Sequence, residues 1–224
     1  MEIALSPLWL SFQLALITSI LLFIIGVPIA YALSQSRSRY KFLWEAIFSL
    51  PLVLPPSVLG FYLLLAFSPN SGLGLFLKDV FQIQLVFTFS GLLIGSVIYS
   101  FPFMVQPVQA AMENLPKSYN EAAQTMGKTR WEILRFIILP NIQPALLSGL
   151  VLSFAHTIGE FGVVLMLGGN IPEVTRVASL AVFDEVESLN YSAAHFYSFI
   201  LLISSFVIIA LTYWLNKKAK LIRL

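Results

Sequence analysis

Cysteine is absent from the 224-residue sequence, and charged residues make up only 11% of it. The lack of cysteine excludes disulfide bonds, thiolate metal sites and cysteine nucleophiles. The scarcity of charge separates the chain from soluble domains, in which roughly 25% of residues are charged. Hydrophobic residues make up 58% of the sequence, and its mean hydropathy is +0.86. This composition predicts a membrane protein.

Several kinds of functional site are missing as well. The sequence has no GxxxxGK[ST] loop, the backbone cradle for nucleotide phosphates, so energy from ATP would have to come from another subunit. Its two histidines and scattered acidic residues lack the spacing of metal ligands. We therefore expect no catalytic residue, no metal, no cofactor and no nucleic-acid partner.

Apolar runs long enough to cross a lipid bilayer recur along the chain. A hydrocarbon core of about 30 Å requires about 20 helical residues. We expect five spans, over residues 8–34, 45–67, 86–112, 136–167 and 194–215. The first run lacks a signal-peptide cleavage pattern and is expected to be retained. The sequence thus predicts an all-α, polytopic membrane protein with one transmembrane domain over residues 1–224.

The fourth expected span is too long for one helix perpendicular to the membrane. It must tilt, protrude or break. Candidate places for a break are Pro140, Pro144, Gly159 and Gly162.

Lysine and arginine predict the orientation. Eleven of them follow expected spans one, three and five, and so share one side of the membrane: Arg37, Arg39, Lys41, Lys117, Lys128, Arg130, Arg135, Lys217, Lys218, Lys220 and Arg223. Only Lys78 and Arg176 fall on the other side. The positive-inside rule then places the N-terminus outside and the C-terminus in the cytoplasm of a cell membrane, the inner one if there are two.

The second expected span contains three prolines, Pro51, Pro55 and Pro56. Proline in a spanning helix removes backbone hydrogen bonds and is tolerated where a neighbour or a cavity satisfies the freed carbonyls. We expect this helix to line a pathway; the alternative is a bent packing helix without a transport role.

His156 and Glu160 are the only ionisable residues at apparent membrane depth. A carboxyl group there indicates a functional site, but Glu160 could instead brace a helix break at Gly159 and Gly162. A carboxylate is a poor ligand for an anion, so direct substrate binding by Glu160 is not expected, and His156 is expected to be a packing or interfacial residue. The pathway or gate candidates are Pro55, Pro56, Gly159, Glu160, Phe161 and Gly162.

A polar segment over residues 117–135 lies on the expected cytoplasmic side. Ser118 with Glu121 fits a capping box, and so does Thr129 with Glu132, which predicts two helix starts. Gly127, between them, predicts a left-handed stop. The segment should therefore be a helix, a sharp glycine turn and a second helix running into the fourth span, with Pro140 marking a change of backbone geometry.

The first of these helices is too short to be stable alone in water. Its narrow apolar stripe consists of Tyr119, Ala122, Ala123 and Met126. A groove on a cytoplasmic partner would supply the missing packing. The alternative is that the helix lies on the membrane surface or on the protein's own loops.

The same segment carries a specific spacing. Glu121, Ala122 and Ala123 are followed after three residues by Gly127, and after nine more residues by Ile137, Leu139 and Pro140 in an I-x-L-P pattern. This resembles the EAA motif of permease subunits in ABC importers. The resemblance implies a coupling helix that docks into an ATP-hydrolysing subunit, with Ser118, Glu121, Ala122, Ala123, Met126, Gly127, Leu139 and Pro140 as coupling residues.

Three further stretches resemble molybdate importer permeases and, more loosely, those for sulfate: PLVLPPSVLG at 51–60, GEFG at 159–162 and NIPEVTR at 170–176. The resemblance implies a type I importer core, two copies of the chain around a pathway, an ATPase dimer and an extracytoplasmic oxyanion-binding protein. Some relatives carry an additional N-terminal helix that this chain is expected to lack. Tungstate or sulfate remain alternative substrates, and an ion-coupled secondary transporter or a membrane scaffold remain alternative classes.

Overall fold

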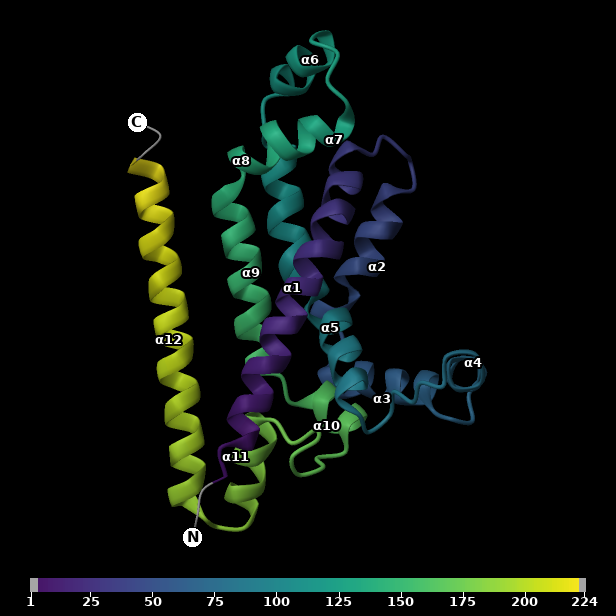
Figure 1. Ribbon diagram of the computed structural model, residues 1–224, viewed down its shortest axis with the longest axis vertical. Helices are drawn as coiled ribbons and strands as arrows, with labels where there is room; N and C mark the ends of the chain where they lie inside the picture. Colours follow the sequence, from purple (N-terminus) through teal and green to yellow (C-terminus); the bar gives the residue numbers. More distant parts are fainter. Residues whose placement is uncertain (1–3, 222–224) are drawn as a thin grey trace.

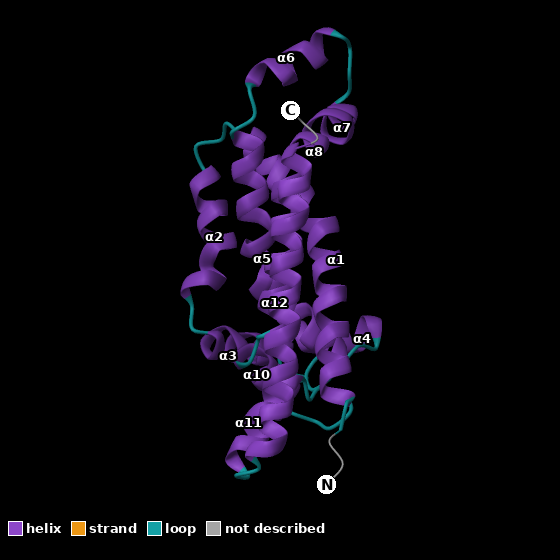
Figure 2. Ribbon diagram, turned by 90° about the vertical axis from the view of Figure 1, so that its left-hand side faces the viewer, coloured by secondary structure: helices purple, strands orange, loops and turns teal. Residues whose placement is uncertain are grey.

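The computed structural model describes residues 4–221, which form helices joined by loops and turns, without a strand in that range (Figure 2). In chain order the helices are α1 (Ser6–Gln35), α2 (Lys41–Val53), α3 (Pro56–Phe67), α4 (Gly72–Phe81), α5 (Phe89–Glu113), α6 (Lys117–Thr125), α7 (Arg130–Ile133), a π-helical turn η1 (Leu134–Ile138), α8 (Leu139–Asn141), α9 (Gln143–Ile158), α10 (Gly162–Gly168), α11 (Ala178–Glu187) and α12 (Tyr191–Leu221). The expected all-α fold is confirmed.

Within the described residues, three helices are long and apolar enough to cross a membrane: α1, α5 and α12. Two bent pairs also qualify, α2 with α3 and Arg130–Asn141 with α9, so the count rises to five if each pair forms one span. This agrees with a polytopic membrane protein of about five spans.

Helices α1, α5 and α9 form the centre of the molecule (Figure 1). Their shared core includes Leu22, Met104 and Val105. Two glycines allow the helices to approach closely around Met104: a Cβ on Gly26 or on Gly149 would lie 3.0 Å from its side chain. Small residues serve membrane helices in this way, because packing rather than water exclusion holds such helices together.

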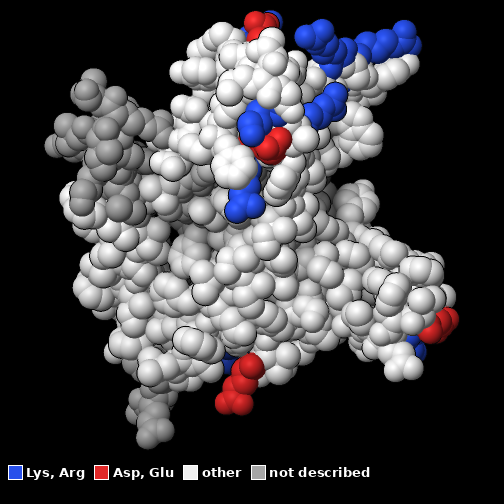
Figure 3. Space-filling view, turned by 45° about the horizontal axis from the view of Figure 1, so that its top comes forward, with Lys and Arg blue, Asp and Glu red and all other residues white. Residues whose placement is uncertain are grey.

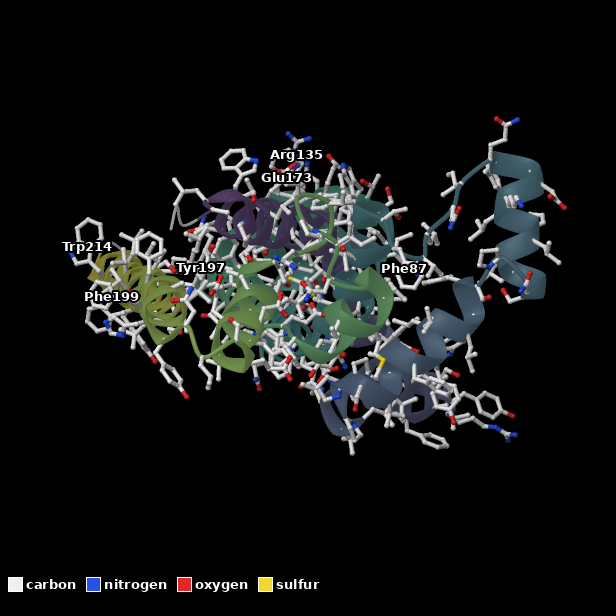
Figure 4. All side chains as sticks on the ribbon, turned by 90° about the horizontal axis from the view of Figure 1, so that it is seen from below. Phe87, Arg135, Glu173, Tyr197, Phe199 and Trp214 are labelled. Carbon is white, nitrogen blue, oxygen red and sulfur yellow. The ribbon has the colours of Figure 1, made fainter. Side chains whose placement is uncertain are left out.

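Helix α12 stands at the edge of the bundle (Figure 1). It packs on α11 and α9, and Tyr197 near its start donates a hydrogen bond from its hydroxyl to the Ala4 carbonyl over 2.7 Å. Phe199 and Trp214 point away from the bundle (Figure 4). The outer face of α12 is therefore available to lipid or to another chain.

The second apolar run bends by 112° between α2 and α3. Leu54 and Pro55 are both extended, with ψ values of 135° and 136°. Each precedes a proline, which disfavours the helical conformation of the residue before it. Pro56 then occupies the first position of α3, where its missing N–H costs nothing. Two successive prolines thus turn α3 across the end of the bundle instead of merely kinking one helix.

The fourth apolar run is broken twice. The first break lies at Ile142, between the candidate positions Pro140 and Pro144, where the segment Arg130–Asn141 meets α9 at 80°. Ile142 leaves helical dihedral angles (φ −105°, ψ 16°), and Pro144 in the first turn of α9 has no N–H to continue the hydrogen-bond ladder. The second break is the loop of residues 159–161 before α10, at the expected Gly159.

Most of the lysine and arginine side chains visible in Figure 3 lie toward the end of the molecule that carries α6, with a few acidic side chains among them, and few basic side chains lie at the opposite end. This distribution follows the sequence pattern from which the orientation was inferred. Arg223, one of the residues used for that inference, lies outside the described residues.

Candidate functional site

The segment 117–135 forms a separate projection at one end of the bundle (Figures 1 and 2). It consists of α6, a turn at residues 126–129 and α7, which continues through η1 and α8 toward α9. The expected order of helix, glycine turn and helix is therefore present.

The start of α6 differs from the expected capping box of Ser118 and Glu121. The helix begins at Lys117 and its N-cap is Pro116, which has no side-chain cap hydrogen bond. Pro116 is extended (φ −56°, ψ 129°) and is the N-cap two residues before the expected cap at Ser118. Ser118 therefore already has helical geometry and cannot act as a cap, so this prediction was wrong.

The end of α6 is a Schellman motif built on Gly127. The glycine has a φ of +73°, the left-handed conformation that the sequence predicted. Its N–H donates to the Gln124 carbonyl over 3.0 Å, and the N–H of Lys128 donates to the Ala123 carbonyl over 3.1 Å. These two bonds satisfy carbonyls that the helix end would otherwise leave unpaired.

The second expected capping box is present at the start of α7. The Glu132 N–H donates to the Thr129 hydroxyl over 3.3 Å, and the Thr129 N–H donates to the Glu132 carboxylate over 2.8 Å. Lys128 pairs with the same carboxylate over 3.1 Å. The Thr129 backbone and the Lys128 ammonium together hold the pKa of Glu132 below its usual range. The turn between the two helices is thus fixed at both ends.

The apolar stripe of α6 is divided between two directions. Ala123 is only 3% exposed and joins the core of the bundle. Tyr119 and Met126 are 46% and 76% exposed, and Ala122 is exposed beside them. One side of α6 therefore attaches to its own chain, while Tyr119, Ala122 and Met126 form an uncovered apolar face.

The connection from this projection into the bundle is well anchored. Ile133, Leu134 and Ile138 are buried in the same core as α1 and α5. Between them the backbone widens into a π-turn, in which the Leu139 N–H donates to the Leu134 carbonyl. Asn141 donates from its side-chain amide to the Ile137 carbonyl over 2.7 Å. A displacement of α6 and α7 would therefore reach α9 through a packed connection that includes Leu139 and Pro140.

A second group of candidate residues surrounds a cavity of about 590 Å³ near the α9–α10 break. Its lining includes Pro56, Gly159, Glu160, Phe161 and Gly162. Five of the six expected pathway candidates therefore meet at one place, and Pro55 lies directly before Pro56 at the α2–α3 bend.

Glu160 is almost fully buried, with 3% exposure. The Ser96 hydroxyl donates to Glu160 Oε2 over 2.7 Å, and the Ser179 hydroxyl donates to the Glu160 backbone carbonyl over 2.6 Å. Glu160 Oε1 is buried without a hydrogen-bond partner in the structure. The residue thus links the helix break to α5 and α11, and one carboxyl oxygen keeps its hydrogen-bonding capacity unused.

His156 packs among neighbouring side chains on the same side of α9. Its ring stacks on Phe103 with centroids 4.0 Å apart and lies 4.6 Å from Tyr99. Its Nδ1 is 2.9 Å from the Ser100 hydroxyl. This is the satisfied packing environment expected for it.

Helix α3 crosses α10 closely enough that glycine is required on both sides. A Cβ on Gly162 would lie 2.7 Å from Pro56 Cβ and 3.0 Å from the Ser57 nitrogen. A Cβ on Gly60 would lie 2.9 Å from Met166 Cβ. Helix α3 therefore packs directly against the break that contains Glu160.

Comparison with known protein families identifies the family to which this chain belongs. The family described as "Binding-protein-dependent transport system inner membrane component" matches residues 6–221. The chain belongs to this family. The match includes both the α6–α7 projection and the Glu160 cavity.

Within the family, the chain is 42% identical to the molybdenum transport system permease protein ModB of Azotobacter vinelandii over 93% of this chain and 92% of that protein. It is 36% identical to the sulfate transport system permease protein CysT of Salmonella typhimurium over 87% of this chain and 70% of that protein. Its fold is also similar to a chain of the MetNI methionine ABC transporter, with a TM-score of 0.75 at 15% identity, covering 97% of this chain and 96% of that one.

Sequence reasoning missed the polar partners on α5. Ser96 and Ser100 lie four residues apart, so they share one face of the helix and meet Glu160 and His156. That spacing within an apolar run was the available signal. Among residues 4–221, no group of three His, Asp or Glu side chains is placed to hold a metal ion.

Proposed function

We propose that the chain is the permease subunit of an ATP-driven importer for a tetrahedral oxyanion, molybdate in particular. The assignment of the substrate rests on the 42% identity to a molybdenum permease over nearly the full length of both chains. The match to a sulfate permease is weaker and covers 70% of that protein, which makes sulfate the second candidate. Tungstate shares the charge and shape of molybdate and is expected to compete with it.

We propose that the α6–α7 projection receives the force of ATP binding. The exposed apolar face of Tyr119, Ala122 and Met126 is what a cleft on a cytoplasmic ATPase subunit would cover. Gly127 holds the angle between α6 and α7. Leu139 and Pro140 lie where the segment joins the bundle. Coupling requires that the open and closed states of the ATPase bind this face with different free energies. Equal binding in both states would not transmit the closure of the ATPase to the permease.

The assembly that we propose contains two copies of this chain, two ATPase subunits and an extracytoplasmic binding protein. The α6 end would face the cytoplasm, since it carries most of the basic residues (Figure 3). The opposite end, formed by α11 and the loops beside it, would then face the binding protein. In this orientation the N-terminus is outside and the C-terminus is cytoplasmic.

The cavity at residues 159–162 would form part of the gate. It lies where two broken runs, α2–α3 and α9–α10, meet, and breaks of this kind are tolerated at membrane depth where they line a cavity or are covered by protein. Its lining is mainly apolar, so a divalent oxyanion would be held weakly and released readily. Glu160 would brace the break through Ser96 rather than bind the anion.

Uptake into proteoliposomes tests this function. Vesicles that contain this chain, its ATPase and its binding protein should accumulate radiolabelled molybdate when ATP is supplied, and a hydrolysis-deficient ATPase is the control. Unlabelled tungstate should reduce uptake strongly and sulfate less so. Uptake that needs an ion gradient and no ATP would instead identify a secondary transporter, and an absence of uptake with all components active would favour a scaffold.

A further inference from the structure

A cavity of about 640 Å³ lies beneath α6, between the end of α1 and the start of α7. Polar and basic side chains from these three helices and the following loop supply most of its lining: Gln35, Ser36, Arg37, Asn120, Gln124 and Arg130. It is separate from the Glu160 cavity, and the proposed transport function makes no use of it.

The charge of this cavity is unbalanced. Two guanidinium groups, Arg37 and Arg130, line it, and none of its lining residues is acidic. Neither arginine takes part in an ion pair among the described residues. The nearest acidic group on α7, Glu132, is already engaged by Thr129 and Lys128. The two arginines therefore retain their full capacity to bind an anion.

The cavity also holds neutral polar groups suited to an oxyanion that carries a proton or a hydroxyl. Arginine and amide N–H groups donate hydrogen bonds to phosphate oxygens, and guanidinium groups do so in a planar fork. Asn120 Oδ1 is buried without a hydrogen-bond partner, so it can accept a bond from a ligand hydroxyl. Cationic donors with one unused buried acceptor match a phosphate group better than a bare carboxylate.

The position of the cavity gives a bound group a mechanical effect. Ala123 is the one residue of α6 that is buried in the core, and its neighbours in the helix, Asn120 and Gln124, line this cavity. Arg37 follows α1 in the fixed bundle, while Arg130 begins α7 in the projection. An anion bound to both would tie the projection to the bundle and limit its movement.

We propose that this cavity binds a phosphate group, bridged by Arg37 and Arg130, which stabilises the α6–α7 projection against the bundle. The group can come from inorganic phosphate or from the headgroup of an anionic lipid, since both present the same tetrahedral chemistry. This binding does not depend on which oxyanion the protein transports.

Thermal unfolding of the purified full chain in phosphatidylcholine nanodiscs, titrated with inorganic phosphate, tests the proposal. Phosphate should raise the unfolding midpoint of the unchanged protein. Arg37→Gln and Arg130→Gln should each raise the phosphate concentration needed for half of this effect about tenfold. This is the loss of affinity expected for one charge-assisted hydrogen bond. Arg39→Gln and Arg135→Gln are matched controls, because these arginines lie near in sequence but do not line the cavity.

A second arm identifies the source. If a lipid headgroup fills the cavity, nanodiscs that contain phosphatidylglycerol should raise the midpoint without added phosphate, and soluble phosphate should add nothing further. If the free anion fills it, phosphatidylglycerol should have no effect and phosphate should act equally in both lipids. Either result must disappear in the Arg37→Gln, Arg130→Gln double variant.

Three results would overturn the proposal: no stabilisation by phosphate or phosphatidylglycerol, equal losses in the control variants, or unchanged stabilisation in the double variant. If the double variant also bound the ATPase more weakly, the two arginines would instead be a protein contact. None of these readouts involves transport, so failure here and failure of the proposed function can be told apart.

Discussion

Replacement of Gly127 should impair the α6–α7 projection while the membrane bundle remains intact. The residue has a φ of +73°, and a Cβ at this position would meet nothing within 4 Å. Any effect of a side chain must therefore come from backbone strain and not from a clash. For an L-residue the left-handed conformation costs roughly 1–2 kcal/mol, and a β-branched residue tolerates it less well.

A cost of about 1–2 kcal/mol changes a local equilibrium by a factor of about 5–30. We expect Gly127→Ala to increase opening of the Schellman motif by that factor and Gly127→Val by more. Hydrogen exchange of the Gly127 and Lys128 amides, whose bonds close the motif, measures this opening directly. Co-purification with the ATPase and ATP-dependent uptake should fall in parallel, while insertion into the membrane should not change.

Gly72→Ala is the matched control. A Cβ on Gly72 also meets nothing within 4 Å, but its φ is not in the left-handed region and it begins α4, away from the projection. This variant should be neutral, or more stable by about 0.4–1 kcal/mol, because alanine restricts the unfolded chain. Normal exchange, ATPase binding and uptake in Gly127→Val would refute the reasoning.

Three further substitutions test separate parts of the structure. Thr129→Ala should destabilise the projection by about 0.5–2 kcal/mol through loss of the capping box, whereas Ser118→Ala should leave it unchanged; amide exchange in the two helices measures both, and equal effects would contradict the cap assignment. Gly162→Ala should cost about 1–3 kcal/mol by forcing α3 away from α10, and an unchanged unfolding midpoint in detergent would show that the crossing is looser than described. Ser96→Ala should cost about 1–3 kcal/mol because it removes the donor to a buried carboxyl oxygen, and Ser148→Ala, which loses only a bond within its own helix, should cost less.

Local chemistry was the predictable part of this protein. Gly127 and the pair Thr129 and Glu132 act within a few residues of one another, so the turn between α6 and α7 could be predicted from spacing alone. The cap at Ser118 failed for an equally local reason: Pro116 has extended dihedral angles and starts the helix earlier. The sequence pattern of Ser118 and Glu121 did not reveal this backbone conformation of the preceding proline.

Long-range geometry was not predictable to the same degree. The prolines at 55 and 56 predicted a disturbed helix, but its 112° bend also depends on the fit of α3 against α10 at Gly60 and Gly162. Ser96 lies 64 residues before Glu160 in the chain, and no local pattern in the sequence joins them. The division of the α6 stripe, with Ala123 inward and Met126 outward, likewise depends on where the bundle lies.

The central claim is that an ATPase subunit binds the exposed face of α6. Cysteine crosslinking tests this claim most directly. Because the chain has no cysteine of its own, single replacements Ala122→Cys and Met126→Cys give an unambiguous position. In a transporter that still takes up molybdate, both should crosslink to the ATPase subunit, with a yield that changes when ATP binds, while Phe199→Cys on the outer face of α12 should not. Labelling of Ala122→Cys by lipid-soluble reagents, or no crosslink to the ATPase in active transporter, would contradict the account.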